Sequence, residues 1–395
     1  MRNKAIDMMR ALTMVLMVTV NEFWSVEGIP HWMHHAKITE DMMGLSDVVF
    51  PLFLFAMGMS IPYAIENKIN QGASGRDIVA HILSRSIALL TMGAFICNSE
   101  HGIGETSGYT YLTYTILMVL GFFLIWNRYP IDLNKWVMRG LKITGIAILL
   151  FLIVSSRSTE GAQFSAYWWG ILGLIGWTYL VCAMIYFLFR NSRKMLLITT
   201  CAFLTINILV TRTNPAHGEI SLLHVHFLHD VLGILHIDNG AHCALGMGGI
   251  LLSVFTRDFV GNMDKRRGII LLCCSVMLMV AFAVTHHYFI ISKLVGTTPW
   301  VLAVMALAVV MYVFFSVLSE KGWDGWFRWI APAGTSTLTC YMMPYVFHVA
   351  MQMTSFQWWE CTRVYPIGLL RCLCFAMLCV GLTWVLGKLK IGLKI

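Results

Sequence analysis

Charged residues are scarce in this sequence. Asp, Glu, Lys and Arg make up 12 % of its 395 residues, while hydrophobic residues make up 58 %. Soluble domains carry about 25 % charged residues, and a soluble fold of this length would have to hide more apolar surface than a single core can bury. The composition excludes an ordinary cytosolic enzyme, a secreted disulfide scaffold and a disordered chain. It leaves a multi-spanning membrane protein, in line with the mean hydropathy of +0.72.

A cysteine framework is also lacking. Eleven Cys is an odd number, nearly all of them fall inside apolar runs, and the sequence has no C-x-x-C pair. Because buried Cys is usually just a small apolar residue, we expect no disulfide scaffold and no metal site. Low-complexity tracts and soluble segments are missing as well, so we predict one integral membrane domain over residues 1–395.

Long apolar runs are abundant instead. A membrane-spanning helix needs about 20 mostly apolar residues, and these continuous runs differ from the alternating segments of β-barrels. We therefore predict an all-α, polytopic membrane helix bundle with about twelve transmembrane helices, or eleven if the short, Gly-rich run at 240–255 does not span. The predicted spans are 6–23, 48–65, 82–97, 109–126, 138–154, 168–189, 195–210, 240–255, 269–291, 299–318, 330–351 and 367–386.

The basic residues fall mainly on one side of this bundle. Twelve spans place both termini on the same side, and 22 of the 28 Lys and Arg lie there. Arg371 lies inside the last span, and the other side has only Lys37, Arg157, Arg212, Lys293 and Arg363. Since Lys and Arg concentrate on the cytoplasmic side, we predict cytoplasmic termini in a cell inner membrane. The net charge of +8 is then a topology signal and implies no nucleic-acid partner.

The opposite, outer side collects histidines and carboxylates, which serve acid–base chemistry near neutral pH and also metal binding. Its longest loop, 212–240, contains a histidine-rich stretch in which His226 and His229 could share a helix face. The spacing matches no zinc signature. We therefore predict that this loop covers an outer cavity and that His229, Asp238 and the following His242 contact substrate, with metal binding as the alternative.

The first outer loop has the most specific pattern. Asn21 closes the first span, the adjacent His34 and His35 follow, and Asp47 opens the second span. Asp47 has two interpretations: it caps the second helix at its positive end, or it orients a histidine and fixes its tautomer. A lone histidine in a loop is usually an ordinary surface residue; two adjacent histidines between Asn and Asp at the membrane boundary strengthen the case for catalysis without displacing that alternative.

This region resembles the transmembrane N-acetyltransferases typified by the lysosomal heparan-α-glucosaminide N-acetyltransferase and its bacterial relatives. That family has a pattern like LDxxRGxxxxxMxxVN, then a His-Ala pair, then xxDLVFPxFLFxxGxS. In this chain, residues 6–11 and 20–21 correspond to the first pattern, residues 35–36 to the His-Ala pair, and residues 47–60 to the last pattern. The chain departs from the family pattern in three places. Ala11 stands where the family has Gly, and the fourth span lacks the Gly-x-Leu-Gln-Arg motif. Residues 335–341 read TSTLTCY instead of Asn-Ser-Ile-Leu-x-Tyr. It therefore resembles a divergent bacterial branch.

The resemblance implies transfer of an acetyl group from cytoplasmic acetyl-CoA to the amino group of a terminal glucosamine, or a related amino sugar of a heparan-like glycan, on the outer side. His35 would carry the catalysis, taking the amine proton or briefly holding the acetyl group. Asp47 would be its partner, and the Asn21 amide could donate to the developing oxyanion. His34 is the second candidate for the catalytic ring. The resemblance also suggests a homodimer.

Such a reaction needs cationic groups for the donor phosphates and aromatic surfaces for the sugar. We predict Arg10, Arg85, Arg266 and Arg267 for the donor, with positive-inside anchoring as the alternative role and an ion pair to Asp7 as the alternative for Arg10. For the sugar, we predict Trp24 and Trp32; their alternative role is in the interfacial aromatic belt.

One further span carries ionisable side chains. Tyr341 and His348 are seven residues apart and so lie roughly on one helical face. An ionisable residue inside a span is a functional candidate, but a hydrogen bond between helices is the more common explanation.

The sequence therefore predicts a membrane-embedded, acetyl-CoA-dependent N-acetyltransferase acting on amino sugars. A polysaccharide O-acetyltransferase is one alternative, because a histidine base accepts a hydroxyl or an amine alike. A proton- or metal-coupled transporter is the alternative from another class. Against a transporter, the sequence has few carboxylates at mid-membrane depth and no paired interrupted helices in matching halves.

Overall fold

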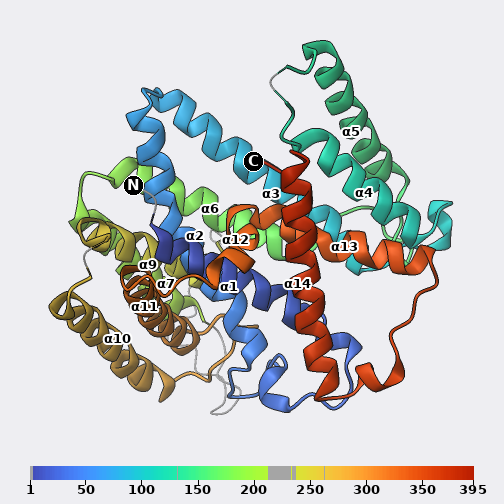
Figure 1. Ribbon diagram of the computed structural model, residues 1–395. Helices are drawn as coiled ribbons and strands as arrows, with labels where there is room; N and C mark the ends of the chain where they lie inside the picture. Colours follow the sequence, from blue (N-terminus) through green and yellow to red (C-terminus); the bar gives the residue numbers. More distant parts are fainter. Residues whose placement is uncertain (1–2, 131, 212–232, 234–236, 262) are drawn as a thin grey trace.

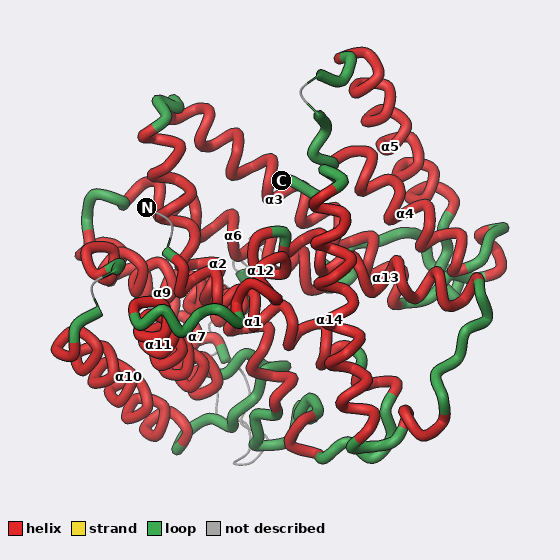
Figure 2. The backbone as a smooth tube through the Cα atoms, in the orientation of Figure 1, coloured by secondary structure: helices red, strands yellow, loops and turns green. Residues whose placement is uncertain are grey.

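The computed structural model describes residues 3–130, 132–211, 233, 237–261 and 263–395. Within these residues the protein is built of helices and loops, with no β-strand (Figure 2). The main helices are α1 (Lys4–Asn21), α2 (Leu45–Asn70), α3 (Gly75–Glu100), α4 (Tyr111–Trp126), α5 (Lys135–Ser155), α6 (Gly170–Phe189), α7 (Arg193–Val210), α9 (Ala241–Thr256), α10 (Lys265–His286), α11 (Thr298–Glu320), α12 (Phe327–Thr335), α13 (Thr337–Met353) and α14 (Ile367–Lys388).

The helices confirm the predicted fold class. Every predicted span corresponds to a helix, and in the described part of the chain eight of them are long and apolar enough to cross a membrane, while α4 and α9 are shorter apolar helices. The predicted span 330–351 is wrong in one respect, since it is divided into α12 and α13. The backbone leaves helical geometry at Ser336, with φ −127° and ψ 47°. The sequence does not predict this break, because Pro332 and Pro344 lie inside the two helices and not between them.

Glycines allow two helix pairs to pack backbone to backbone. A Cβ on Gly58 of α2 would lie 2.1 Å from the carbonyl oxygen of Gly246 in α9. A Cβ on Gly93 of α3 would lie 2.3 Å from the backbone nitrogen of Gly173 in α6. Small residues permit this close approach in membrane bundles, where association depends on van der Waals packing. The first contact joins α2 to α9, and α2 also packs against α1 and α11, while α9 packs against α7 and α11 (Figure 1).

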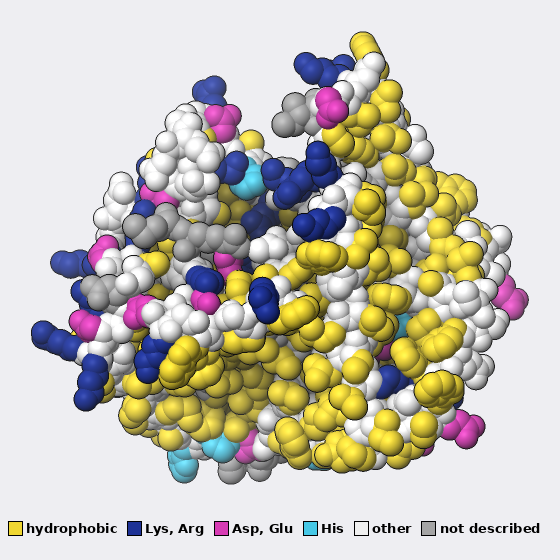
Figure 3. Space-filling model, viewed as in Figure 1, with side chains coloured by type: hydrophobic (Ala, Val, Ile, Leu, Met, Phe, Trp, Pro, Cys, Tyr) yellow, Lys and Arg dark blue, Asp and Glu magenta, His cyan; other side chains and the backbone are white. Residues whose placement is uncertain are grey.

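Two helices lie at the periphery and expose apolar side chains. In Figure 1, α5 and α10 form opposite outer edges of the molecule. Leu150 and Val154 of α5 are exposed, as are Met277 and Val280 of α10. Figure 3 shows the same character across much of the visible face, which is covered by hydrophobic side chains. Apolar surface on this scale suits a lipid environment.

Loop contacts join segments that the sequence places on the same side. Asp41 accepts hydrogen bonds from His286 and from the backbone of Ile291, linking two predicted outer loops. At the other end, the Arg128 backbone donates to Gly392, linking a predicted inner loop to the C-terminal segment. On the face seen in Figure 3, Lys and Arg gather toward the top and left, and histidines lie at the lower edge, with one more beside the Lys and Arg near the top. The bundle therefore has a basic end and a histidine-bearing end.

Candidate active site

The start of α2 brings His35 and Asp47 together. Nδ1 of His35 and Oδ1 of Asp47 are 2.6 Å apart. The other carboxylate oxygen, Oδ2, accepts the backbone N–H groups of Ala36 at 2.9 Å and Gly44 at 3.2 Å. The Asp47 side chain is 1 % exposed and that of His35 is 51 % exposed. Both interpretations of Asp47 therefore fit the geometry: Oδ2 satisfies the N–H of Gly44 at the start of α2 and that of Ala36 in the loop, while Oδ1 holds the imidazole.

Lys293 is the member of this cluster that the sequence reasoning missed. Its Nζ lies 3.3 Å from Nδ1 of His35 and 3.9 Å from Oδ1 of Asp47. Burial lowers the pKa of the Lys293 amine, and the Asp47 carboxylate opposes that shift. Lys293 is one of only five basic residues on the predicted outer side, and that rarity is the signal that could have identified it.

Two predicted substrate residues lie beside the same cluster. The His242 ring stacks edge-on against Phe50 and Trp300, with centroids 5.6 and 6.4 Å away. Trp300 donates its indole N–H to the Asp47 carbonyl at 3.1 Å. Asp238 and Lys293 are close enough to interact electrostatically with His242. His229 lies outside the described residues.

The remaining residues of the first outer loop are divided between two places. The His34 ring lies 6.4 Å from the Phe23 ring, and the His34 carbonyl oxygen packs against Gly44. His34 therefore contributes to the packing of the loop, while His35 bonds to the Asp47 carboxylate. Trp32 is exposed in the same turn. Asn21 and Trp24 line a different space, an outer cavity described below. Asn21 therefore lies at the wall of the outer cavity, and its predicted role beside His35 stays a prediction.

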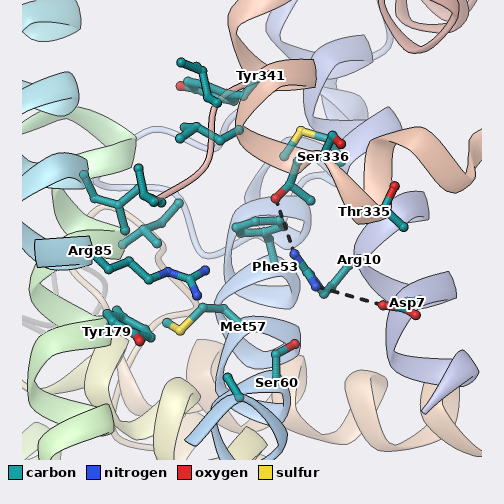
Figure 4. A pocket seen from close by; sticks show the side chains of 18 of the residues that line it. Asp7, Arg10, Phe53, Met57, Ser60, Arg85, Tyr179, Thr335, Ser336 and Tyr341 are labelled. Carbon is teal, nitrogen blue, oxygen red and sulfur yellow. Dashed lines mark hydrogen bonds and ion pairs between the residues drawn. The ribbon is translucent and has the colours of Figure 1, made fainter. Parts of the chain in front are cut away.

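A cavity of about 360 Å³ opens between α1, α2, α3, α6 and the α12–α13 break, and we call it the inner cavity. Arg10 and Arg85 both line it, together with Arg128 and Lys394, two cations that the sequence reasoning missed. Figure 4 shows the Arg10 and Arg85 side chains extending from opposite sides of this space. Figure 3 shows Lys and Arg bordering a hollow near the C-terminus. Four cations face one acidic side chain, Asp7.

The two predicted arginines are held differently. Arg10 donates to the Thr337 hydroxyl at 3.4 Å and lies 4.0 Å from Asp7, so the ion pair considered from the sequence forms at long range. The Arg85 guanidinium lies over the Tyr179 ring, 4.6 Å from its centroid. Its Nε is buried without a hydrogen-bond partner, which is costly for a charged donor unless a ligand supplies the acceptor.

Arg266 and Arg267 do not join this cavity. Both lie in the first turn of α10, where the backbone N–H of Arg267 donates to Asp264 at 2.7 Å. Neither residue lines the inner cavity, so their role in donor binding stays a prediction that this cavity does not support. The positive-inside rule also explains two arginines at a helix start near the basic end. The position of α10 at the periphery of the bundle favours this anchoring role over donor binding.

A second cavity of about 790 Å³, the outer cavity, lies at the other end of α1 and α13. Nε2 of His348 and Oε1 of Glu22 are 2.8 Å apart at its wall. Tyr341 lines both cavities. The tyrosine and histidine predicted to share a helical face therefore line the same space, and the inner and outer cavities meet at Tyr341.

Comparisons with known proteins agree with the motif at the start of the chain. A family described as a domain of unknown function, DUF5009, matches residues 2–222. The heparan-alpha-glucosaminide N-acetyltransferase of Mus musculus is 30 % identical over 139 residues, which are 33 % of this chain and 20 % of the mouse protein. The Homo sapiens protein of the same name is 29 % identical over 106 residues, 27 % of this chain and 15 % of the human one.

These similarities are partial. The matched segments span a fifth or less of the length of the two curated relatives, whereas the family match covers more than half of this chain. The chain belongs to the DUF5009 family and is a divergent relative of the heparan-alpha-glucosaminide N-acetyltransferases.

Proposed function

We propose that this protein is a membrane acetyltransferase that moves an acetyl group from acetyl-CoA on the cytoplasmic side to the amino group of glucosamine or a related amino sugar on the outer side. The observation that carries the proposal is the meeting of two unlike cavities at Tyr341. One is lined by four cations and the other by carboxylates, amides and aromatic rings. The names of the two curated relatives supply the reaction class.

The inner cavity suits a phosphate-bearing donor. Arg10, Arg85, Arg128 and Lys394 provide cations that favour phosphate. The partnerless Nε of Arg85 offers a donor atom already withdrawn from water. Ser336 and Thr337, at the first turn of α13, also line this cavity, and a helix N-terminus favours an anion. A thioester at the far end of a donor held here would point toward Tyr341.

The outer end supplies acid–base groups. By the family resemblance His35 is the catalytic histidine, and the bond to Asp47 supports that role because it fixes which ring nitrogen carries the proton. The nitrogen of the acceptor attacks the acetyl carbonyl, the C–N bond forms and the C–S bond breaks. The ammonium RNH₃⁺ gives up two protons overall, one to the departing thiolate and one to solvent.

Radiolabelled acetyl transfer in proteoliposomes tests this function. Wild-type protein, supplied with acetyl-CoA and glucosamine, should label the sugar, and His35→Ala should lower the rate by about 10²- to 10⁴-fold. N-acetylglucosamine, whose amine is blocked while its hydroxyls are free, should not be labelled; labelling of it with equal efficiency would instead establish O-acetylation. No labelling of any acceptor would refute the proposal.

A transporter remains the second candidate because of one structural feature. The break between α12 and α13 makes a discontinuous helix that lines the inner cavity, and discontinuous helices bind substrates and ions in many transporters. Sugar uptake into proteoliposomes without acetyl-CoA would support transport. Acetyl labelling without such uptake would support the transferase.

A further inference from the structure

We propose that the outer cavity is the binding site of the acceptor amine, with His348 as the base that takes the first proton from its ammonium group and Glu22 as the carboxylate that orients His348 and attracts the cation. This inference rests on the proposed acetyl transfer. It adds a second histidine–carboxylate pair to the reaction: His348 takes the first proton, before attack, whereas by the family resemblance His35 acts on the second proton, which is released as the C–N bond forms. Neither His35 nor Asp47 is among the residues that line the outer or the inner cavity.

Glu22 is placed as a buried acid at a cavity wall. It follows the last residue of α1 and is 6 % exposed. The adjacent turn is fixed by Arg371 of α14, which donates to the carbonyl oxygen of Ser25 at 3.1 Å. A buried carboxylate is expensive unless it is paired. His348 supplies that partner, and the carboxylate charge also attracts a cation that enters the cavity.

The hydrogen bond to Glu22 determines which ring nitrogen of His348 can accept a proton. An ionised carboxylate only accepts hydrogen bonds, so Nε2 of His348 donates to Glu22 at 2.8 Å. Nδ1 of the neutral ring is then the basic nitrogen. The Glu22 carboxylate would also stabilise the imidazolium formed when Nδ1 takes a proton, as a partner carboxylate does for other catalytic histidines.

The walls of the outer cavity suit an amino sugar. Among the described residues that line it, Glu22 and Glu100 are acidic and none is Lys or Arg. The sign of the charge is thus opposite to that of the inner cavity, and it favours a cationic ligand. Trp24 is 77 % exposed, with its ring 6.2 Å from that of His348, and such a ring provides an apolar platform for a sugar. Gln352 and Gln357 add donors and acceptors for hydroxyl groups.

The proton balance gives this pair a defined step. An amino sugar near neutral pH is largely RNH₃⁺, which has no lone pair for attack. Nδ1 of His348 takes one proton to give RNH₂ and passes it to solvent on the outer side. RNH₂ then attacks the thioester carbonyl, the C–S bond breaks, and the second amine proton ends on the thiolate. The sum is RNH₃⁺ plus acetyl-CoA giving the amide, CoA thiol and one proton.

The test compares two acceptors that differ in the need for that step. Glucosamine must lose a proton before attack, whereas methoxyamine is uncharged at neutral pH. His348→Gln should lower kcat with glucosamine by about 100-fold, within the range of general-base catalysis, and should affect methoxyamine far less. Glu22→Gln should raise KM for glucosamine about 10-fold, because the cavity loses a carboxylate charge that attracts the ammonium group, and should lower kcat because His348 loses its orienting partner.

His286→Gln is the matched control. His286 also pairs with a carboxylate, Asp41, at 2.9 Å and lies at the same end of the protein, but it lines neither cavity. It should leave both acceptors unchanged. Wild-type kcat for His348→Gln, or equal losses with the two amines, would overturn the proposal.

Glucosamine binding without acetyl-CoA separates this inference from the proposed function. If the wild type transfers no acetyl group, the transferase assignment fails on its own. The ligand-induced rise in thermal unfolding temperature then tests the site directly. A rise in the wild type that is lost in Glu22→Gln and kept in His286→Gln supports the cavity as the amine site. The same rise in Glu22→Gln would overturn it.

Discussion

Replacing Asp47 with Asn tests the acid–base pair at the start of α2 with the smallest change of shape. Asp47 makes two kinds of contact from an almost fully buried position: Oδ2 accepts the backbone N–H groups of Ala36 and Gly44, and Oδ1 holds His35. An Asn carbonyl oxygen can keep the two backbone bonds. Its NH₂ group then faces Nδ1 of His35, which must become an acceptor, and the ring proton moves to the other nitrogen.

The expected magnitudes for stability and activity differ. A hydrogen bond to a charged group contributes about 1.5–3 kcal/mol, but the His35 side chain is half exposed, so solvent screening reduces its contribution to stability to about 1 kcal/mol. Activity depends on the tautomer itself. Loss of a correctly protonated base lowers the rate by about 10²- to 10⁴-fold.

The assay measures both quantities on the same preparation. Thermal unfolding in lipid nanodiscs reports stability, and labelling of glucosamine from acetyl-CoA reports activity. Asp41→Asn is the control, because Asp41 also pairs with a histidine, His286, at 2.9 Å but is far more exposed. A folded Asp47→Asn protein with kcat/KM within about threefold of the wild type would refute the orienting role of Asp47.

Three further predictions concern the donor site, the packing and the topology. Arg85→Met should raise KM for acetyl-CoA about 10- to 100-fold, by loss of one charge-assisted phosphate contact. The control, Arg139→Met at an exposed position, should leave KM unchanged. Steady-state kinetics at saturating acceptor would measure both, and an unchanged KM for Arg85→Met would contradict the donor cavity. Gly58→Ala should lower the free energy of unfolding by about 3 kcal/mol, the upper end of the overpacking range, because its Cβ would meet backbone at 2.1 Å; unfolding at the wild-type temperature would contradict the backbone contact of α2 with α9. A membrane-impermeant maleimide added to intact cells should label the wild type through the exposed Cys361 and should not label Cys361→Ser; labelling only after the cells are opened would reverse the proposed orientation.

Much of the fold follows from the sequence because hydrocarbon imposes a simple rule. A backbone inside a bilayer must satisfy its own hydrogen bonds, so each long apolar run becomes a helix. The predicted runs and the observed helices agree on this basis. The break at Ser336 escaped prediction because it depends on packing: a Cβ on Gly334 would lie 2.7 Å from the carbonyl oxygen of Asp7, so α12 is pressed against α1 where the run changes direction.

The site was predictable where its residues are close in sequence. His35 and Asp47 are twelve residues apart, joined by one short loop, and their pairing follows from a histidine beside a helix start. Lys293 comes from a loop some 250 residues later. Glu22 and His348 are 326 residues apart. Pairings at that separation depend on which helices become neighbours.

The sequence by itself determined that the chain is a helical membrane protein with a basic end and a histidine-bearing end, since the cost of placing charge in hydrocarbon sorts residues by side. It also supplied the motif that links the chain to its relatives. The tertiary structure decided which residues of each end share a space. It placed Arg85 and Arg128 at the wall of one cavity, which Arg266 does not line, and Asn21 and His348 at the wall of another. The physical reason is that hydropathy acts on each helix separately, whereas a cavity forms only where side chains from several helices fail to fill the space between them.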